Sequence, residues 1–191
     1  MMNSWLRNSW ILIMDCNVVS LRIMKSSEQI DREPELDEVT LDNANDLTQL
    51  RLTIDNNKTP EELKKESEKF ASREGYKAFI VRKGESPMGY VQVKLEEELP
   101  PEAGAIEGLE NMAHLARIGV VEECRGQGIG PKLLAIAEKW AHDEGKAGMW
   151  LGYLVSNEAA ARLYEGAGYE DVAEFTDPLK GKLRRITVKR F

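Results

Sequence analysis

The sequence predicts one α/β domain in which a mixed, mostly antiparallel sheet of six to seven strands is flanked by helices. Three observations support this fold class. The 191 residues are 42% hydrophobic and 31% charged, as in a globular domain with a sizeable core. Segments of strand periodicity alternate with segments of helical periodicity along the chain. A glycine-rich turn at residues 125–130 joins a valine-rich strand to a helix.

The first 35 residues are expected to be an N-terminal extension, with the domain itself spanning residues 36–191. Residues 18–23 are rich in β-branched and apolar side chains and predict an edge strand added to the sheet. The alternative is an extension that docks only loosely on the domain. A secretory signal is not expected, because the apolar run ends at Asp15 and is shorter than such a signal requires.

Two helices follow a short strand that is predicted at residues 36–41. Asn45 is expected to cap the first helix, whose apolar residues recur at helical spacing. The second helix has a stronger start signal. Thr59 precedes Pro60 and stands three residues before Glu62, which is the pattern of a capping box with proline at the first helical position.

A hairpin is predicted next, with strands at residues 76–83 and 88–95 joined by residues 84–87. Its second strand alternates cleanly, so successive side chains lie on opposite faces. One face carries Gly89, Val91, Val93 and Leu95, and the other carries Tyr90, Gln92 and Lys94.

A long acidic connection at residues 96–111 is expected to be a solvated loop, with a cation-binding rim as the alternative. Strands and helices then alternate to the end of the chain. The strands are predicted at residues 114–121, 149–153, 169–175 and 184–190, and the helices at residues 130–144 and 157–165.

Charge and cysteine content exclude several classes of protein. The net charge of −7 disfavours a nucleic-acid binder, which would show a basic patch. The sequence contains no run of about 18 apolar residues, so no membrane span is expected. Cys16 and Cys124 are too few for a disulfide framework and lack the spacing of a zinc site. We therefore expect a cytoplasmic protein without a bound metal.

The residues from Arg125 to Pro131 carry the most chemical information. Glycines at three alternate positions leave the backbone unshielded, so main-chain N–H groups can converge on an anion. The positive end of the helix dipole adds to the attraction, and Arg125 and Lys132 supply positive charge. Pro131 fits the first helical turn, which does not need its missing N–H. The turn predicts a phosphate-binding site built mainly from backbone donors.

Two common phosphate-binding patterns do not fit this turn. A Walker loop requires G-x-x-x-x-G-K followed by Ser or Thr, which the sequence lacks. A dinucleotide fingerprint requires G-x-G-x-x-G, but its third glycine falls on Leu133 counted from Gly128, or on Pro131 counted from Gly126. A nucleotide-dependent oxidoreductase is therefore disfavoured.

At two places the sequence resembles the GCN5-related N-acetyltransferase (GNAT) superfamily. The family pattern Gln/Arg-x-x-Gly-x-Gly/Ala appears from Arg125 to Gly130. A second pattern, Asn-x-x-Ala-x-x-Leu-Tyr-x-x-x-Gly-Phe, is similar to residues 157–169, with Tyr169 in the place of Phe. One helix and one strand lie between the two patterns, as in the family, and the resemblance covers about residues 36–190.

The resemblance implies acetyl-CoA as a co-substrate. Its pyrophosphate would lie on backbone amides of the glycine turn. Its pantetheine arm would lie along the preceding strand, where the family's strand carries a bulge that splays the sheet. Tyr164 would reach the cofactor sulfur and act in catalysis. The implied cofactor-binding residues are Val120, Val121, Arg125, Gly126, Gln127, Gly128, Ile129, Gly130 and Asn157.

His114 is the first candidate for the catalytic base that deprotonates the amine. It lies eleven positions before Arg125, where several family members resemble one another in carrying a carboxylate. Its unperturbed pKa near 6.5 suits base catalysis at neutral pH, so a break in the rate is expected near pH 6.5. Glu107 and Glu110 are the alternatives for the base, and His114 would then be a structural histidine.

The expected activity is direct acetyl transfer to a primary amine of a small molecule, either polyamine-like or another cationic amine. Residues 115–118 and 149–152 resemble the small-amine branch of the family, whereas Gly119 departs from it, since an aromatic is common there. The alternatives are acetylation of a protein or peptide amine and a non-catalytic acetyl-CoA-binding module. A homodimer is a further candidate assembly. Acidic residues that would attract a cationic acceptor occur at positions 96–98, 102, 107 and 110.

Overall fold

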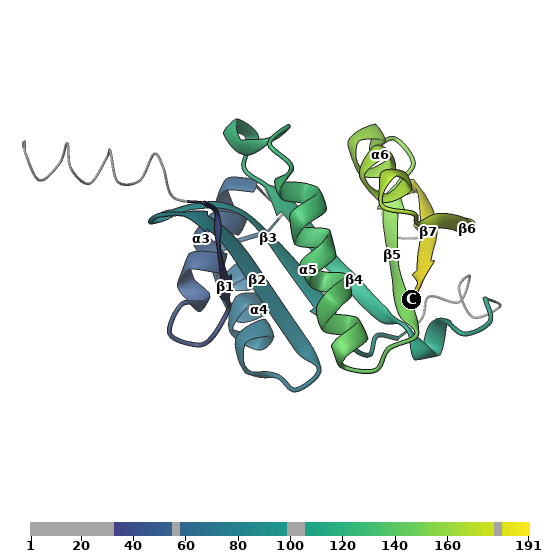
Figure 1. Cartoon of the computed structure of the whole chain (residues 1–191), viewed down its shortest axis with the longest axis horizontal. Coiled ribbons are helices and arrows are strands. Elements are labelled where there is room, and N and C mark those ends of the chain that lie inside the picture. The colour runs from purple at the N-terminus through teal and green to yellow at the C-terminus, as the bar shows by residue number, and fades with distance from the viewer. Residues whose placement is uncertain (1–32, 55–57, 99–105, 178–180) are drawn as a thin grey trace, which may run out of the picture.

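A computed structural model describes residues 33–54, 58–98, 106–177 and 181–191, which contain one seven-stranded sheet (Figure 1). The strands are β1 (Glu35–Glu38), β2 (Tyr76–Lys83), β3 (Ser86–Lys94), β4 (Ala113–Val120), β5 (Gly148–Leu154), β6 (Glu170–Thr176) and β7 (Leu183–Arg190). Their order across the sheet is β1-β2-β3-β4-β5-β7-β6. Within these described ranges, neighbouring strands pair antiparallel except β4 and β5, which are parallel. The predicted mixed, mostly antiparallel sheet is confirmed. The strand predicted at residues 18–23 lies outside the described residues.

Four helices cover the two faces of the sheet (Figure 1). They are α3 (Ala44–Ile54), α4 (Pro60–Ser72), α5 (Ile129–Asp143) and α6 (Glu158–Gly166). On one face, Leu47 of α3 and Phe70 of α4 pack against Ile80 and Tyr90. We refer to this face as the α3/α4 face. Two short 3-10 turns, η2 (Leu109–Asn111) and η3 (Glu122–Cys124), flank β4.

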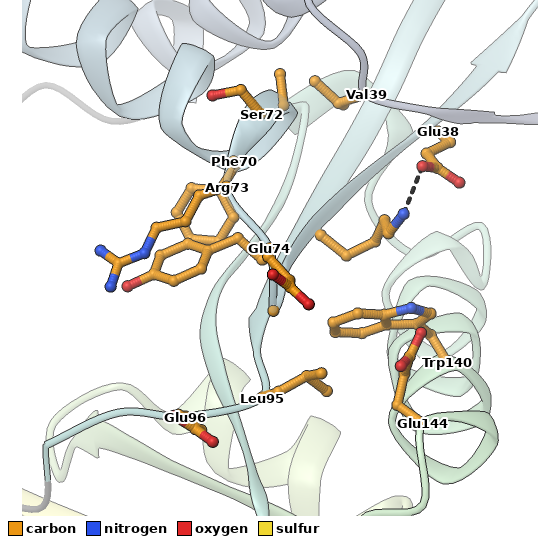
Figure 2. Close-up of a pocket in the computed structure, with 14 residues that line it drawn as sticks. Glu38, Val39, Phe70, Ser72, Arg73, Glu74, Leu95, Glu96, Trp140 and Glu144 are labelled. Atoms are coloured by element: carbon orange, nitrogen blue, oxygen red, sulfur yellow. Dashed lines mark hydrogen bonds and ion pairs between the residues drawn. The ribbon is translucent and has the colours of Figure 1, made fainter.

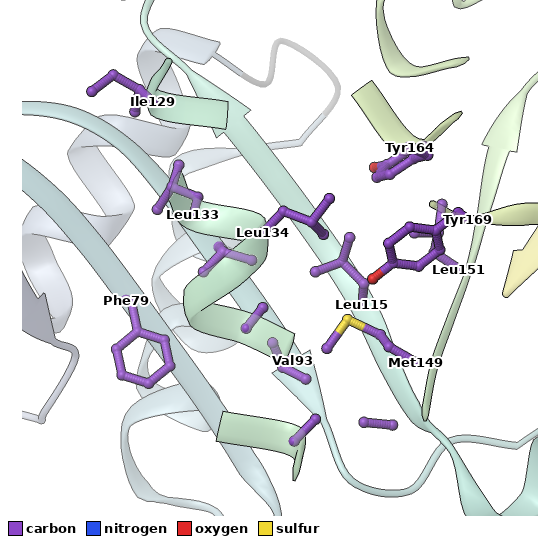
Figure 3. Packing of buried hydrophobic residues seen from close by; sticks show 14 of the residues in the cluster. Phe79, Val93, Leu115, Ile129, Leu133, Leu134, Met149, Leu151, Tyr164 and Tyr169 are labelled. Carbon is purple, nitrogen blue, oxygen red and sulfur yellow. The ribbon is translucent and has the colours of Figure 1, made fainter. Parts of the chain in front are cut away.

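The opposite face, covered by α5 and α6, holds the largest part of the core. Leu134 of α5 lies beside Leu115 of β4, and Leu133 belongs to the same cluster (Figure 3). Tyr164 of α6 and Tyr169 join the same cluster. The 3.6-residue spacing of the apolar residues in each helix produces this buried stripe.

The start signals of the first two helices have different outcomes. Asn45 is not a cap, because α3 begins at Ala44, one residue earlier. The turn before α3 is closed instead by Asn43, whose carbonyl accepts the N–H of the residue three positions later. The capping box of α4 is confirmed: the N–H of Glu62 donates to the Thr59 hydroxyl at 3.3 Å, and the N–H of Thr59 donates to the Glu62 carboxylate at 2.8 Å.

Strand β3 is buried on both faces, since helices cover both sides of the sheet. Val91 and Val93 belong to the α5 side, as their alternation predicts. On the α3/α4 face, Tyr90 is 1% exposed and Gln92 is 0% exposed. The alternation in the sequence therefore marks two buried faces, and one of them encloses a polar amide.

The sheet opens between β4 and β5. These parallel strands are in register only at their first residues, where Ala113 pairs with Met149 and His114 pairs with Trp150. Beyond His114 the two strands diverge toward the end of the sheet at which α5 begins (Figure 1). On the other side of β4, the register with β3 shifts by one residue at Ala116, and such a bulge increases the local twist. The predicted splay of the sheet is observed here.

Candidate active site

The glycine turn forms an unshielded N-terminus for α5. Gly126 and Gly128 have φ angles of +73° and +77°, in the left-handed region that glycine adopts without steric cost. Gly128 is the N-cap of α5 and provides no side-chain cap. Among the described residues, the N–H groups of residues 126–130 have no acceptor. These N–H groups can converge on an anion at the positive end of the helix dipole.

The polar side chains around the turn differ in their hydrogen-bond partners. Arg125 is exposed, and its Nε lies 3.5 Å from the carbonyl of Val120. Gln127 donates to the carbonyl of Glu123 at 3.0 Å, which ties the turn to η3. Lys132 donates to the carbonyl of Pro34 at 2.8 Å, so it contacts the start of the described chain rather than the turn. Of the two predicted cations, only Arg125 is left to supplement the backbone donors.

The edge of β4 that faces β5 is open along its second half. β5 pairs with β4 only as far as His114, so the polar backbone groups on that edge from Leu115 to Val120 lie outside the ladder. Val121 is bound from the other side, because its N–H donates to the carbonyl of Met88 at 2.9 Å. An extended polar chain could hydrogen-bond along this edge and end at the glycine turn.

Asn157 and Tyr164 lie at the start and in the last turn of α6. The Asn157 side chain accepts the N–H of Ala160 at 3.1 Å and thereby caps the helix. Tyr164 is 6% exposed, and its ring centroid lies 5.6 Å from that of Tyr153 and 5.7 Å from that of Tyr169. Burial, with a smaller effect of Tyr153, raises the pKa of the Tyr164 hydroxyl well above its ordinary value near 10. The hydroxyl therefore stays protonated at neutral pH and can act as a hydrogen-bond donor.

His114 lies on the α3/α4 face, at the point where β4 and β5 separate. Its ring stacks on Trp150 with centroids 4.1 Å apart. Burial lowers the pKa of His114 to about 4, with smaller effects from Glu97, which raises it, and from Lys94 and Arg184, which lower it. The imidazole is therefore neutral at pH 7 and can accept a proton. The expectation of an unperturbed pKa near 6.5 does not hold in the folded chain.

The two carboxylates that are the alternatives for the base are not placed like His114. Glu107 and Glu110 are exposed, and Glu110 accepts a bond from the side chain of Asn111 at 3.4 Å. The carboxylate that acts electrostatically on His114 is Glu97, which pairs with Lys94 at 2.5 Å. The sequence had marked Glu97 only as part of an acidic run. The acidic position 102 lies outside the described residues.

The lowered pKa of the partly buried His114 predicts a pH dependence of stability. Because its pKa in the folded protein is about 4 and the unfolded value is near 6.5, the unfolded chain binds the proton first as the pH falls. This contribution to stability is complete above pH 6.5 and is lost as the pH falls through about 4. We expect the melting temperature to fall more steeply between pH 6.5 and 4 in the wild type than in His114→Gln, measured by scanning calorimetry. Parallel curves would contradict this prediction.

Gly119 is small because another aromatic side chain occupies the space above it. A Cβ at Gly119 would lie 2.7 Å from Cε1 of Tyr90 and 3.1 Å from Cγ2 of Ile54. Tyr90 projects from β3, which pairs with β4 at Gly119. An aromatic ring therefore covers this position, but it comes from the neighbouring strand and is itself buried in the core.

A groove of about 720 Å³ lies elsewhere, between the ends of α4 and α5 and the start of β2 (Figure 2). Trp140 and Glu144 line it from the α5 side, and Glu74 lines it from the opposite side. Trp140 is 12 residues after Gly128, which corresponds to about 18 Å along a helix axis. The groove is therefore separate from the glycine turn.

In the described part of the chain, no group of three or more His, Cys, Asp and Glu side chains is placed to hold a metal ion. Likewise, none of the helices in the described ranges is both long and apolar enough to cross a membrane.

Comparison with known proteins gives a consistent family match. The sequence model of the acetyltransferase (GNAT) family matches residues 44–169. The chain is 30% identical over 114 residues to an acetyltransferase of Agrobacterium fabrum, covering 59% of this chain and 82% of that protein. It is 31% identical over 71 residues to YobR, an uncharacterised N-acetyltransferase of Bacillus subtilis, covering 37% of this chain and only 29% of YobR.

The fold has counterparts among solved structures. The structure of NAA60 from Arabidopsis thaliana in complex with acetyl-CoA superposes with a TM-score of 0.65 at 16% identity. The superposition covers 83% of this chain and 99% of that one. At this level of identity the likeness concerns the fold.

Proposed function

Because the chain belongs to the acetyltransferase (GNAT) family, we propose that it transfers the acetyl group of acetyl-CoA directly to a primary amine of a small molecule. The single observation that carries the proposal is the pairing of two features. The sheet opens between β4 and β5, and the unshielded N-terminus of α5 lies at the open end. Such an opening beside an anion site suits an extended cofactor that carries a diphosphate.

The residues of the chain fit this cofactor. The N–H groups of residues 126–130 have no acceptor among the described residues, and a Cβ at Gly126 or Gly128 would meet no atom within 4 Å. A diphosphate can therefore approach the backbone closely. We assign the binding of the pantetheine arm to the open edge of β4 at Val120 and Val121, and to the side chain of Asn157.

Acetyl-CoA supplies an activated thioester. The residues of the chain must remove a proton from the amine and stabilise the negative charge that develops on the leaving sulfur. At pH 7 only about one aliphatic amine in two thousand is uncharged and able to attack. His114 is our candidate for the base that takes the amine proton, because its ring is neutral at pH 7. As the N–C bond forms and the C–S bond breaks, negative charge develops on sulfur. Tyr164 would stabilise that charge by donating a hydrogen bond.

Tyr164 is not expected to give up its proton completely. A simple thiol has a pKa of about 8.5, and burial places the pKa of Tyr164 far above this value. Full proton transfer to the thiolate would therefore be uphill, whereas a hydrogen bond to the developing charge remains favourable. The cofactor thiolate would leave the site unprotonated or take its proton from solvent.

For the acceptor, we propose a cationic amine of the polyamine-like class. We also propose that the protein acts in the cytoplasm. The support is the negative net charge of −7 and the acidic connection before β4, in which exposed Glu107 and Glu110 remain available. Glu97 contributes less, since Lys94 already pairs with it.

The experiment that tests the proposed function measures binding and turnover separately. Acetyl-CoA binding is measured by calorimetry, and CoA release is followed with a thiol-reactive dye against polyamines, amino acids, aminoglycosides and peptides. Release with polyamines supports the proposal, and preference for peptides would move the acceptor to a protein amine. Binding without release from any amine would indicate a non-catalytic binding module, and the lack of binding would refute the proposal.

A glycine pair at the two ends of α5 tests the cofactor site. Gly128 and Gly145 both have φ of +77°, and a Cβ at either would meet no atom within 4 Å. Alanine at either position should cost about 1–2 kcal/mol of stability through backbone strain alone. Only Gly128→Ala should also weaken acetyl-CoA binding, by up to about 30-fold, because an anion contact at a helix N-terminus contributes up to about 2 kcal/mol. Calorimetric titration of both variants checks this, and equal affinities would remove the turn from the cofactor site.

A further inference from the structure

Two buried polar groups on the α3/α4 face have no hydrogen-bond partner among the described residues. Gln92 is 0% exposed, and both the nitrogen and the oxygen of its amide are unpartnered. Nδ1 of His114 is buried and unpartnered as well. Buried polar atoms are nearly always hydrogen-bonded to protein or to ordered water. Each of these groups therefore needs an explanation.

The register of the strands brings the two side chains near each other. Lys94 of β3 is opposite His114 of β4, and Gln92 stands two residues before Lys94 on the same face. Gln92 is itself opposite Arg117, so its amide and the His114 ring lie on the same face on either side of the register shift. The bulge at Ala116 lies between them on β4. A buried water usually has two to four polar partners that would otherwise be unpaired, so one water could serve both side chains.

The two ring nitrogens of a neutral imidazole have different roles in a hydrogen bond. One ring nitrogen carries the hydrogen, and the other carries the lone pair. Nδ1 of His114 points into the protein, whereas Nε2 is not enclosed in this way. A catalytic base therefore requires the hydrogen on Nδ1 and the lone pair on Nε2, and the Nδ1 hydrogen requires an acceptor.

Charged neighbours of His114 are engaged elsewhere. Lys94 and Glu97 pair with each other at 2.5 Å. Arg184 of β7 donates to the carbonyl of Gly152 at 2.8 Å. Trp150 covers one face of the imidazole and fixes its plane. The Gln92 amide is therefore the polar group of β3 that is left without a partner in the described chain and lies on the same face.

We propose that Gln92 is a positioning residue for His114: its side-chain oxygen accepts the Nδ1 hydrogen of His114 through one internal water. This contact fixes the tautomer that presents the Nε2 lone pair to the acceptor amine. The amine proton then moves to Nε2, and the imidazolium keeps its Nδ1 hydrogen on the same water. The choice of tautomer and its catalytic consequence rest on the proposed function, whereas the water-mediated contact between Gln92 and His114 does not.

The tautomer can be measured directly in the full-length protein. The sequence has two histidines, so nitrogen-15 NMR of the imidazoles gives two sets of signals, and His142→Gln assigns them. We expect His114 to carry its hydrogen on Nδ1 at pH 7. In Gln92→Leu, which keeps a buried side chain of similar length, the population should shift to the Nε2–H form. In Gln92→Glu, the Nδ1–H form should return and the pKa of His114 should rise, because a carboxylate faces it.

Three outcomes would overturn the positioning role. These are an Nε2–H tautomer in the wild type, an unchanged tautomer in Gln92→Leu, and a tautomer that responds to Glu97→Gln instead. The wild-type measurement decides the question even where a variant fails to fold. Ser67→Ala is the matched control, since Ser67 is buried on α4 and its hydroxyl donates within the helix to Leu63; it should leave the tautomer unchanged.

Kinetics separate this inference from the proposed function. We expect Gln92→Leu to lower kcat by about 10–100-fold, the range seen when hydrogen-bond partners of metal-bound histidines are removed, with the KM for acetyl-CoA unchanged. An inactive wild type with a Gln92-dependent tautomer would refute the proposed function alone. An active enzyme in which Gln92→Leu leaves the His114 tautomer unchanged would refute the positioning role alone.

Discussion

Tyr164→Phe is expected to lower the turnover of acetyl transfer by about 10²–10⁴-fold, the range typical of a residue that manages a proton or a developing charge. The phenylalanine ring keeps the packing against Tyr153 and Tyr169, so the fold and acetyl-CoA affinity should change little. Only the hydroxyl is lost, and with it the donor to the leaving sulfur. Steady-state kinetics and calorimetric titration of the variant measure the two quantities.

Tyr153→Phe provides the matched control. The Tyr153 hydroxyl donates to Asp171 at 3.3 Å, toward β6 and away from the opening of the sheet. Removing it should therefore leave turnover within a few-fold of the wild type. If Tyr164→Phe also retained full turnover, the hydroxyl of Tyr164 would have no part in the chemistry, and the proposed stabilisation of the thiolate would be wrong.

His114→Gln is expected to lower turnover at pH 7 by about 10²–10⁴-fold, because glutamine cannot take the proton of the amine. Since burial lowers the pKa of His114 to about 4, the base stays available well below neutral pH. We expect kcat/KM, expressed per uncharged amine, to be level from about pH 8 down to about pH 5 in the wild type. The pH profile of initial rates checks this expectation.

The other histidine serves as the control for this variant. His142 is exposed in the last turn of α5, with its ring 5.9 Å from that of Phe191, and His142→Gln should not change the rate. A break near pH 6.5 in the wild type would mean that His114 is solvated in the working enzyme. Full activity of His114→Gln would exclude it as the base.

Much of the fold follows from local signals in the sequence. The capping box at Thr59 and the apolar spacing of α5 depend on residues within a few positions of each other, so they can be read without a structure. Asn45 shows where this reading is weakest. Asn43 closes the turn before α3 instead, and several nearby polar residues can fill such a role at a helix start.

In the candidate site, too, some features depend on neighbouring residues in the sequence and others depend on distant ones. The glycine turn is local, because its φ angles and free N–H groups are properties of six consecutive residues. The role of Lys132 could not be predicted, since its partner Pro34 is 98 residues away in the sequence. The same holds for Gly119, whose missing side chain is explained by the ring of Tyr90 on the next strand.

The sequence by itself determined the family pattern, the order of strands and helices, and the position of the glycine turn, because each depends on neighbours along the chain. Only the tertiary structure decided the electrostatic state of His114 and the isolation of Gln92. Desolvation is caused by whatever packs around a group, and here the ring of Trp150 on β5 stacks on the imidazole. That packing partly desolvates His114 and lowers its pKa from 6.5 to about 4.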